Sequence, residues 1–189
     1  MIRGYFNLGH EVTVLAMNTK KHYYDMKLLP PGIAMMARFY PVKVDTSVEL
    51  LPAFFNLFSR KSYNIERFNS KIVKEKLIEL LLNQSFDLVQ LEGLYLCPYI
   101  KTIRKYSDAK IAMRAHNIES DIWKGLAKNT NGLKGIYLAF LKRRMQRYEK
   151  RSLNQYDFLI PVTEKDDAKF KELGSKCLAH VAPIGIDVG

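Results

Sequence analysis

Short apolar runs alternate along the chain with stretches in which apolar residues recur at the spacing of one helix face. The apolar runs predict strands at residues 11–17, 35–44, 86–91, 110–115, 157–162 and 177–182. The periodic stretches predict a helix that ends just before Gly9, and further helices at residues 64–82, 99–106, 118–127, 133–153 and 164–173. Pro41 interrupts the second strand and cannot donate a ladder hydrogen bond, so an edge position is expected for it.

This alternation predicts an α/β fold: a Rossmann-like, open parallel sheet with helices on both faces. The chain has 189 residues, 48% of them apolar, which suffices for one full core. No internal repeat and no Pro/Gly-rich linker divides it. We therefore expect residues 1–182 to form one domain.

Net charge and cysteine content limit the partners and metal sites that are expected for this chain. A net charge of +11 indicates an anionic partner, which could be nucleic acid, an acidic membrane surface or a phosphorylated substrate. Cys97 and Cys177 lack the spacing of a metal site and are expected to be free thiols. The start of the chain lacks a signal-peptide pattern and no apolar run is long enough to span a bilayer, so a cytoplasmic location is expected.

Several chemistry-bearing motifs are missing. The chain has no GxGxxG, GxxxxGK[ST], GxSxG or HExxH pattern, which weakens dehydrogenase, nucleotide kinase, serine hydrolase and zinc protease interpretations. It also has no Asp-x-Asp pair to hold a divalent cation. We expect no metal and no cofactor.

Polar residues instead gather directly after four predicted strands, where ligands bind in open α/β sheets. These clusters are Asn18-Thr19, Glu92-Gly93, His116-Asn117 and Thr163-Glu164. His116 could hold a phosphate, a sugar hydroxyl or a proton in transit, or it could be a hydrogen-bonded structural residue. The residues alone leave these alternatives open.

The neighbours of His116 also have two interpretations each. Asn117 is a natural N-cap of the next helix, whose start could also offer free N–H groups to an anion. Arg114 would need a carboxylate partner when buried, either Glu92 or Glu119.

Two further positions are equally ambiguous. Gly93 could allow close approach of a ligand or only a tight turn. Thr163 with Asp166 fits a capping box.

Two segments could face a membrane or a greasy acceptor. The predicted helix at 133–153 has a core-facing apolar stripe, and its other face is basic, including Arg143 and Arg147, with Ile136 and Phe140 among the charges. A solvated basic face with another element covering the apolar pair is the alternative. The aromatic residues of the second segment, which could equally belong to the core, are Phe54, Phe55 and Phe58.

Five segments, taken in order, resemble the amino-terminal domain of GT-B glycosyltransferases of family 4. They read GHEVTVL at 9–15, FDLVQLE at 86–92, RAHNIE at 114–119 with Trp123, PVTE at 161–164 with Asp166, and PIGID at 183–187. The resemblance covers nearly the whole chain.

This resemblance implies a function. Such enzymes move a hexosyl group, with retention and without a required metal, from a nucleotide-sugar donor to a glycan, lipid-linked or other acceptor, as in the synthesis of cell-surface polysaccharides. The position of His116 would face the donor sugar and the reacting centre. The surrounding cleft would include Glu92, Gly93, Asn117, Glu119 and Thr163.

The resemblance also implies differences from the whole family domain. The family has a strand and a Gly-rich loop ahead of its first helix, and residues 183–189 resemble the beginning of the crossing to a donor-binding domain. From this comparison the isolated chain is expected to be inactive. Two strand edges are expected to be unpaired, or newly paired with each other.

Two other functions stay open. The charge of +11 would suit a nucleic-acid-binding module, although the chain has no RNP-like or GXXG signature, so no nucleic acid is expected as partner. A noncatalytic interaction domain on a Rossmann-like scaffold is the second alternative, because fold does not fix function. Peripheral association with the inner face of an acidic membrane is a further hypothesis.

Overall fold

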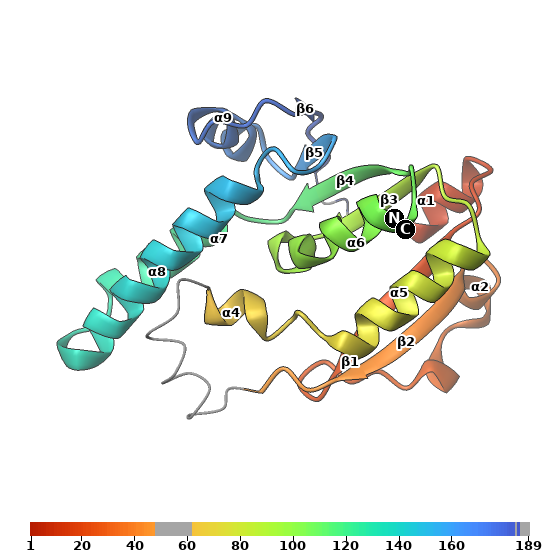
Figure 1. Ribbon diagram of the computed structural model, residues 1–189, viewed down its shortest axis with the longest axis horizontal. Coiled ribbons are helices and arrows are strands. Elements are labelled where there is room, and N and C mark those ends of the chain that lie inside the picture. Colours follow the sequence, from red (N-terminus) through yellow and green to blue (C-terminus); the bar gives the residue numbers. More distant parts are fainter. Residues whose placement is uncertain (48–61, 184, 186–189) are drawn as a thin grey trace.

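A computed structural model of the chain describes residues 1–47, 62–183 and 185. It is a mixed α/β structure in which parallel sheets are flanked by helices (Figure 1), as the alternating pattern predicts. One sheet has the order β3-β4-β5-β6 and the other consists of β1 and β2. The strands are β1 (Thr13–Thr19), β2 (Arg38–Val44), β3 (Leu88–Glu92), β4 (Lys110–Ala115), β5 (Phe158–Pro161) and β6 (Leu178–Ala179).

The helices fall between these strands. They are α1 (Ile2–Asn7), η1 (Met26–Leu28), α2 (Pro31–Ala34), α4 (Tyr63–Glu66), α5 (Lys71–Asn83), η2 (Leu94–Tyr99), α6 (Ile100–Tyr106), α7 (Glu119–Lys128), α8 (Gly132–Ser152) and α9 (Glu164–Glu172). Gly9 has φ +82° just after α1, which fits the predicted helix end. Pro41 lies in β2, whose one strand partner in the described ranges is β1, in agreement with the predicted edge position.

Strand β4 is the centre of the larger sheet. Ile111, Ala112 and Met113 are all buried, so both faces of the strand are covered. Its backbone pairs in parallel with β3 on one side and with β5 on the other. The apolar run of the sequence therefore marks this strand correctly from end to end.

The predicted helix at 64–82 is two helices, α4 and α5. The chain breaks between them because Ser70 caps α5, its Oγ accepting the N–H of Val73 at 3.5 Å. The Tyr99 hydroxyl closes the gap: it accepts the N–H of Ser70 at 2.8 Å and donates to the Phe68 carbonyl at 2.7 Å. Apolar spacing alone does not reveal this interruption.

Strand β6 is shorter than predicted, covering Leu178–Ala179 rather than 177–182. The chain nevertheless stays alongside β5, because the N–H of His180 donates to Leu159 and that of Ala182 donates to Pro161. The predicted extended segment is present, but its pairing is sparse.

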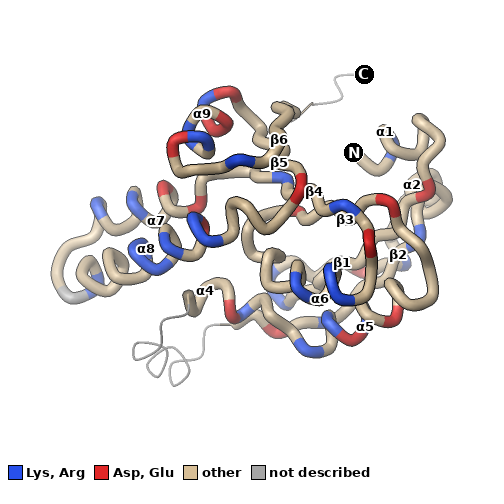
Figure 2. The backbone as a smooth tube through the Cα atoms, turned by 45° about the horizontal axis from the view of Figure 1, so that its top comes forward, with Lys and Arg blue, Asp and Glu red and all other residues tan. Residues whose placement is uncertain are grey.

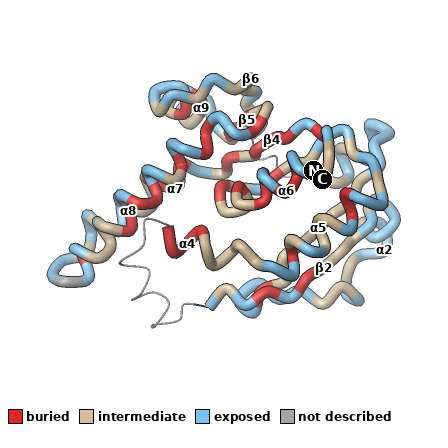
Figure 3. Tube along the Cα trace, viewed as in Figure 1, coloured by how far each residue is buried: buried red, intermediate tan, exposed pale blue. Residues whose placement is uncertain are grey.

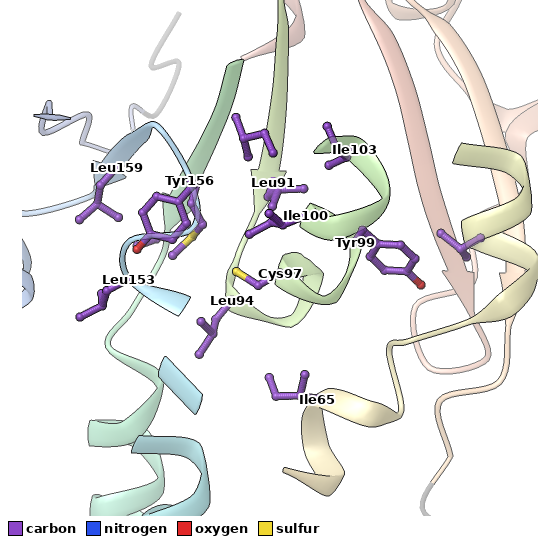
Figure 4. Packing of buried hydrophobic residues seen from close by; sticks show 14 of the residues in the cluster. Ile65, Leu91, Leu94, Cys97, Tyr99, Ile100, Ile103, Leu153, Tyr156 and Leu159 are labelled. Atoms are coloured by element: carbon purple, nitrogen blue, oxygen red, sulfur yellow. The ribbon is translucent and has the colours of Figure 1, made fainter. Parts of the chain in front are cut away.

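The hydrophobic core lies around β3, β4 and η2 (Figure 4). Leu91 and Leu94 lie near Leu153 and Tyr156, which follow the carboxyl end of α8. All four belong to one buried cluster. Cys97 lies in the same cluster, and burial raises the pKa of its thiol to about 12. Both cysteines are free thiols, as predicted, and Cys97 is held as an inert core residue.

Helices α7 and α8 lie side by side and project from the sheets (Figure 1). Figure 3 shows buried positions recurring along one side of α8. Leu141 and Met145 of the predicted stripe are buried and Tyr148 is partly buried. The predicted core face of this helix is therefore correct.

Phe54, Phe55 and Phe58 lie outside the described residues, so their assignment to a membrane or acceptor surface stays a prediction.

A carboxylate joins β4, β5 and α6 at the amino ends of the strands. Asp157 Oδ2 accepts the N–H of Ile111 and a hydrogen bond from Arg104 Nη2, both at 2.7 Å. Burial of Asp157 opposes its ionisation, but these contacts outweigh burial and hold its pKa below the usual value of 3.8. The ionised carboxylate therefore contributes to stability.

We predict that Asp157→Asn lowers the free energy of unfolding by about 1.5–3 kcal/mol, the range for a hydrogen bond to a charged group. Because the folded pKa is depressed, this contribution is present above about pH 3.8 and is lost as the pH falls through the folded pKa. Urea unfolding at several pH values measures it. Asp108→Asn, at an exposed residue shortly before β4, is the matched control. Equal effects of the two variants would contradict the assignment.

Candidate functional site

The carboxyl ends of β3 and β4 bring two predicted site residues together. Glu92 pairs in register with Arg114, and His116 follows one residue after β4 ends. His116 Nε2 lies 3.0 Å from Glu92 Oε2, and each side chain is 37% exposed. The site therefore contains an imidazole that is oriented by a carboxylate and accessible to solvent.

Arg114 takes Glu92 as its partner. Its Nη1 lies 3.6 Å from the same Oε2 atom that faces His116, and its side chain is only 16% exposed. The other carboxylate oxygen, Oε1, accepts a hydrogen bond from Gln90 Nε2. Glu92 is thus held from three sides, which fixes the position that it offers to His116.

Gly93 makes the turn that follows Glu92. Its φ of +105° and ψ of 163° are accessible almost only to glycine. No described atom would lie within 4 Å of an added Cβ, so the backbone conformation, and not crowding, requires glycine here. The tight-turn interpretation explains this residue.

Glu119 pairs with Tyr95 and not with Arg114. The Tyr95 hydroxyl donates to Glu119 Oε2 at 2.8 Å. Burial raises the pKa of Glu119, and the Tyr95 hydrogen bond and the charge of His116 act against this rise. Burial and the charge of Glu119 likewise raise the pKa of Tyr95. Tyr95 therefore stays a hydrogen-bond donor at neutral pH.

The start of α7 corrects the prediction for Asn117. The N-cap residue is Ile118, whose side chain makes no capping hydrogen bond, and Asn117 is exposed one residue earlier. The first N–H groups are not free for an external anion either. Glu149 Oε1 accepts the N–H of Glu119 at 2.8 Å and its Oε2 accepts that of Ser120 at 3.3 Å.

Glu149 is thus a site residue that the sequence reasoning missed. It comes from α8, is only 2% exposed, and places a carboxylate at the positive end of α7. A signal was present: Glu149 follows Met145 by four residues, so an acidic residue stands on the core-facing stripe of that helix. A buried acid in this position needs donors, and the start of α7 supplies them.

Thr163 caps α9, as the capping-box pattern predicts. Its Oγ1 accepts the N–H of Asp166 at 3.0 Å and donates to Asp166 Oδ2 at 2.7 Å. These contacts stay within the helix start and do not join Thr163 to His116.

The Asn18-Thr19 cluster, which forms the carboxyl end of β1, is structural as well. Asn18 exchanges two hydrogen bonds with the backbone of Tyr24, and Thr19 accepts the N–H of His22. These contacts hold the loop that follows β1. The polar groups of Asn18 and Thr19 are therefore engaged by the loop's own backbone.

The basic face of α8 is exposed, and Figure 2 shows basic residues recurring along this helix. Arg143 and Arg147 are exposed, and Ile136 is 69% exposed. Phe140 is half-buried, with the Arg144 guanidinium carbon 4.1 Å from its ring centroid. Part of the predicted apolar pair is thus covered by an arginine of the same helix.

Within residues 1–47, 62–183 and 185, no group of three or more His, Cys, Asp or Glu side chains is placed to hold a metal ion. The same ranges contain no helix with the length and hydropathy needed to cross a membrane. The chemistry that the described site offers is proton transfer and hydrogen bonding by an oriented imidazole.

Comparison with protein-family models and with curated proteins finds no match to this chain.

We predict that Glu149→Gln changes the pH dependence of stability. Burial raises the pKa of Glu149 above its usual value of 4.5, although the N–H groups of Glu119 and Ser120 oppose the rise. A raised folded pKa means that the stabilising contribution is complete below the unfolded pKa and declines as the pH rises through the folded pKa. The variant should match the natural chain near pH 4 and become relatively more stable toward neutral pH.

Denaturant unfolding of both proteins across this range checks the expectation. Glu172→Gln, at an exposed glutamate at the end of α9, is the matched control for the same change of side chain away from α7. A pH-independent difference for Glu149→Gln would show that its carboxyl ionises as easily when folded as when unfolded.

Proposed function

We propose that this chain forms the acceptor-side domain of a retaining, metal-independent glycosyltransferase of the GT-B type, family 4. The observation that carries the proposal is the His116–Glu92 pair, with 3.0 Å between Nε2 and Oε2, at the adjacent carboxyl ends of β3 and β4. This is the edge of an open α/β sheet at which ligands bind. The order of the five sequence segments supports the same assignment.

The pair suggests how His116 would act. When Glu92 accepts a hydrogen bond from Nε2–H, the neutral imidazole keeps its lone pair on Nδ1. Nδ1 can then accept a hydrogen bond from a hydroxyl of the donor sugar, which would hold that sugar at the reacting centre. Glu92 would be a positioning residue that sets the tautomer and the ring orientation.

The diphosphate of a nucleotide-sugar donor needs positively charged groups, and those of the described site are already engaged by carboxylates. Arg114 lies within 3.6 Å of Glu92, and the start of α7 is occupied by Glu149. Stabilisation of the leaving diphosphate is therefore assigned to the donor-binding domain of a GT-B enzyme. On this proposal residues 1–189 alone bind sugar but do not turn over a nucleotide sugar.

The test is saturation-transfer NMR of the chain with UDP-glucose, UDP-N-acetylglucosamine and GDP-mannose. We expect saturation of sugar-ring protons for one of them, and a Kd that weakens by about tenfold or more in His116→Ala, the loss of about one charge-supported hydrogen bond. Lys110→Gln, at the opposite end of the same strand, is the matched control and should leave binding unchanged.

Unchanged sugar binding in His116→Ala would remove His116 from the account. Hydrolysis or transfer of the sugar by the 189 residues would refute the division of labour between two domains. The nucleic-acid alternative would be favoured by a different result: no sugar binds, and nucleic acid gives a salt-dependent shift of equal size in His116→Ala and Lys110→Gln.

We also propose that the domain works in the cytoplasm, at the inner face of an acidic membrane. The exposed basic face of α8 and the exposed Ile136 side chain support this location. Flotation with vesicles that contain anionic lipid tests it: the double variant Arg143→Glu, Arg147→Glu should lose most of its vesicle-bound fraction.

A second double variant, Lys101→Glu, Lys105→Glu on α6, changes the net charge equally and is the control, since both residues are exposed. It should keep binding. If the two double variants float to the same extent, α8 has no special part in membrane association.

A further inference from the structure

The two sheets leave a gap between strands β1 and β3. Residues 13–17 of β1 and 88–92 of β3 line one cavity of about 680 Å³. In the described part of the chain, β1 pairs only with β2, and β3 pairs only with β4. The outer edges of both strands therefore present backbone N–H and C=O groups to the same space.

The wall of this cavity that α5, η2 and α6 form is largely apolar, whereas Lys21, His22, Thr46 and Arg67 line another part of it. The side chains that line it from α5, η2 and α6 are Val73, Leu77, Leu80, Leu81, Tyr95, Leu96, Tyr99 and Ile103. A ligand that fills the space must therefore offer apolar groups to these helices and hydrogen bonds to two strand edges. An extended peptide does both, whereas an acyl chain would leave both edges without partners.

The two edges run in the same direction. Strand β1 is parallel to β2, and the chain passes from β2 through α5, which packs on β2, to β3. A helical crossover of this kind returns the chain parallel to the strand that it left, and the two sheets lie beside each other in Figure 1. One strand placed between β1 and β3 can therefore be parallel to both.

The start of α1 lies beside the larger sheet, next to the same gap. Gln90 Nε2, at the middle of β3, lies 3.0 Å from Met1 Sδ, and Arg114 Nη1 lies 3.6 Å from the same sulfur. Helix α1 thus begins beside the middle of β3 and the carboxyl end of β4, and it ends at Asn7, before β1 starts at Thr13.

From these observations we infer that the gap between β1 and β3 binds one further β-strand, an extended peptide segment that is parallel to both edges and apolar on the face that meets α5, η2 and α6. Strand β3 has five residues and β1 has seven, which sets the length of the guest segment. The bound strand joins the two sheets into one continuous parallel sheet. This inference does not depend on the proposed sugar transfer, since it concerns the strand edges and not His116.

The experiment is hydrogen–deuterium exchange by mass spectrometry on the 189-residue chain. The probe is the synthetic octapeptide Lys-Val-Leu-Ile-Val-Val-Thr-Lys, whose apolar residues cover both strand faces. At saturation we expect amide exchange to slow by about tenfold or more in both β1 and β3. The same peptide with N-methyl groups on alternate residues should protect only one of the two strands, because its remaining N–H groups all face one edge.

A variant of the chain supplies a second check. Leu77→Lys places an ammonium group in the apolar wall and should weaken peptide binding by about tenfold or more. Ile72→Lys, on the same helix but 60% exposed, is the matched control and should bind as the natural chain does. If Leu77→Lys does not fold, the comparison of the octapeptide with its N-methylated form still tests whether a strand enters the gap.

Three results would overturn the inference. Exchange that is unchanged in both strands at saturating peptide would show that no strand enters the gap. Protection of one edge only would indicate ordinary addition at a sheet edge. Protection of β1 and β3 by decanoate, with none by the peptide, would make the cavity a lipid site.

Discussion

The backbone of β4 is the constraint on which the arrangement depends. Its side chains are covered on both faces, so its N–H and C=O groups can be satisfied only by strands on either side. Parallel pairing with β3 then aligns the carboxyl ends of the two strands. That alignment brings Glu92 to within 3.0 Å of His116, two residues that are 24 positions apart in the sequence. The candidate site is thus a direct product of the central ladder.

Much of this fold follows from local patterns. β4 is predicted without error at residues 110–115, because its apolar run is bounded by polar residues on both sides. The split between α4 and α5 could not be predicted in the same way. Both halves carry apolar residues at helical spacing, and the break depends on the Tyr99 hydroxyl, which lies 29 positions from Ser70. Periodicity reports which face is buried, not where a distant hydroxyl interrupts a helix.

The candidate site likewise has features that local patterns predict and features that they do not. Glu92 and His116 are predictable as neighbours, since both follow apolar strands and parallel strands end at one edge. The partner of Arg114 was a choice between two glutamates, and only geometry selects Glu92. Asn117 was assigned the cap from residue preference, which cannot register a carboxylate arriving from α8. Local sequence patterns do not predict these contacts, because the partner residues lie far away along the chain.

The capping of α7 by Glu149 also bears on the order in which the chain assembles. That contact joins residues 30 positions apart, whereas the contact of Met1 with Gln90 spans 89 positions. Closing the longer loop costs about 1 kcal/mol more in chain entropy. The α7–α8 pair is therefore favoured to form early and α1 to dock late. Until α1 docks, the Gln90 side chain of β3 and the Arg114 side chain of β4 lack their contacts with Met1, so this part of the larger sheet is completed late in folding.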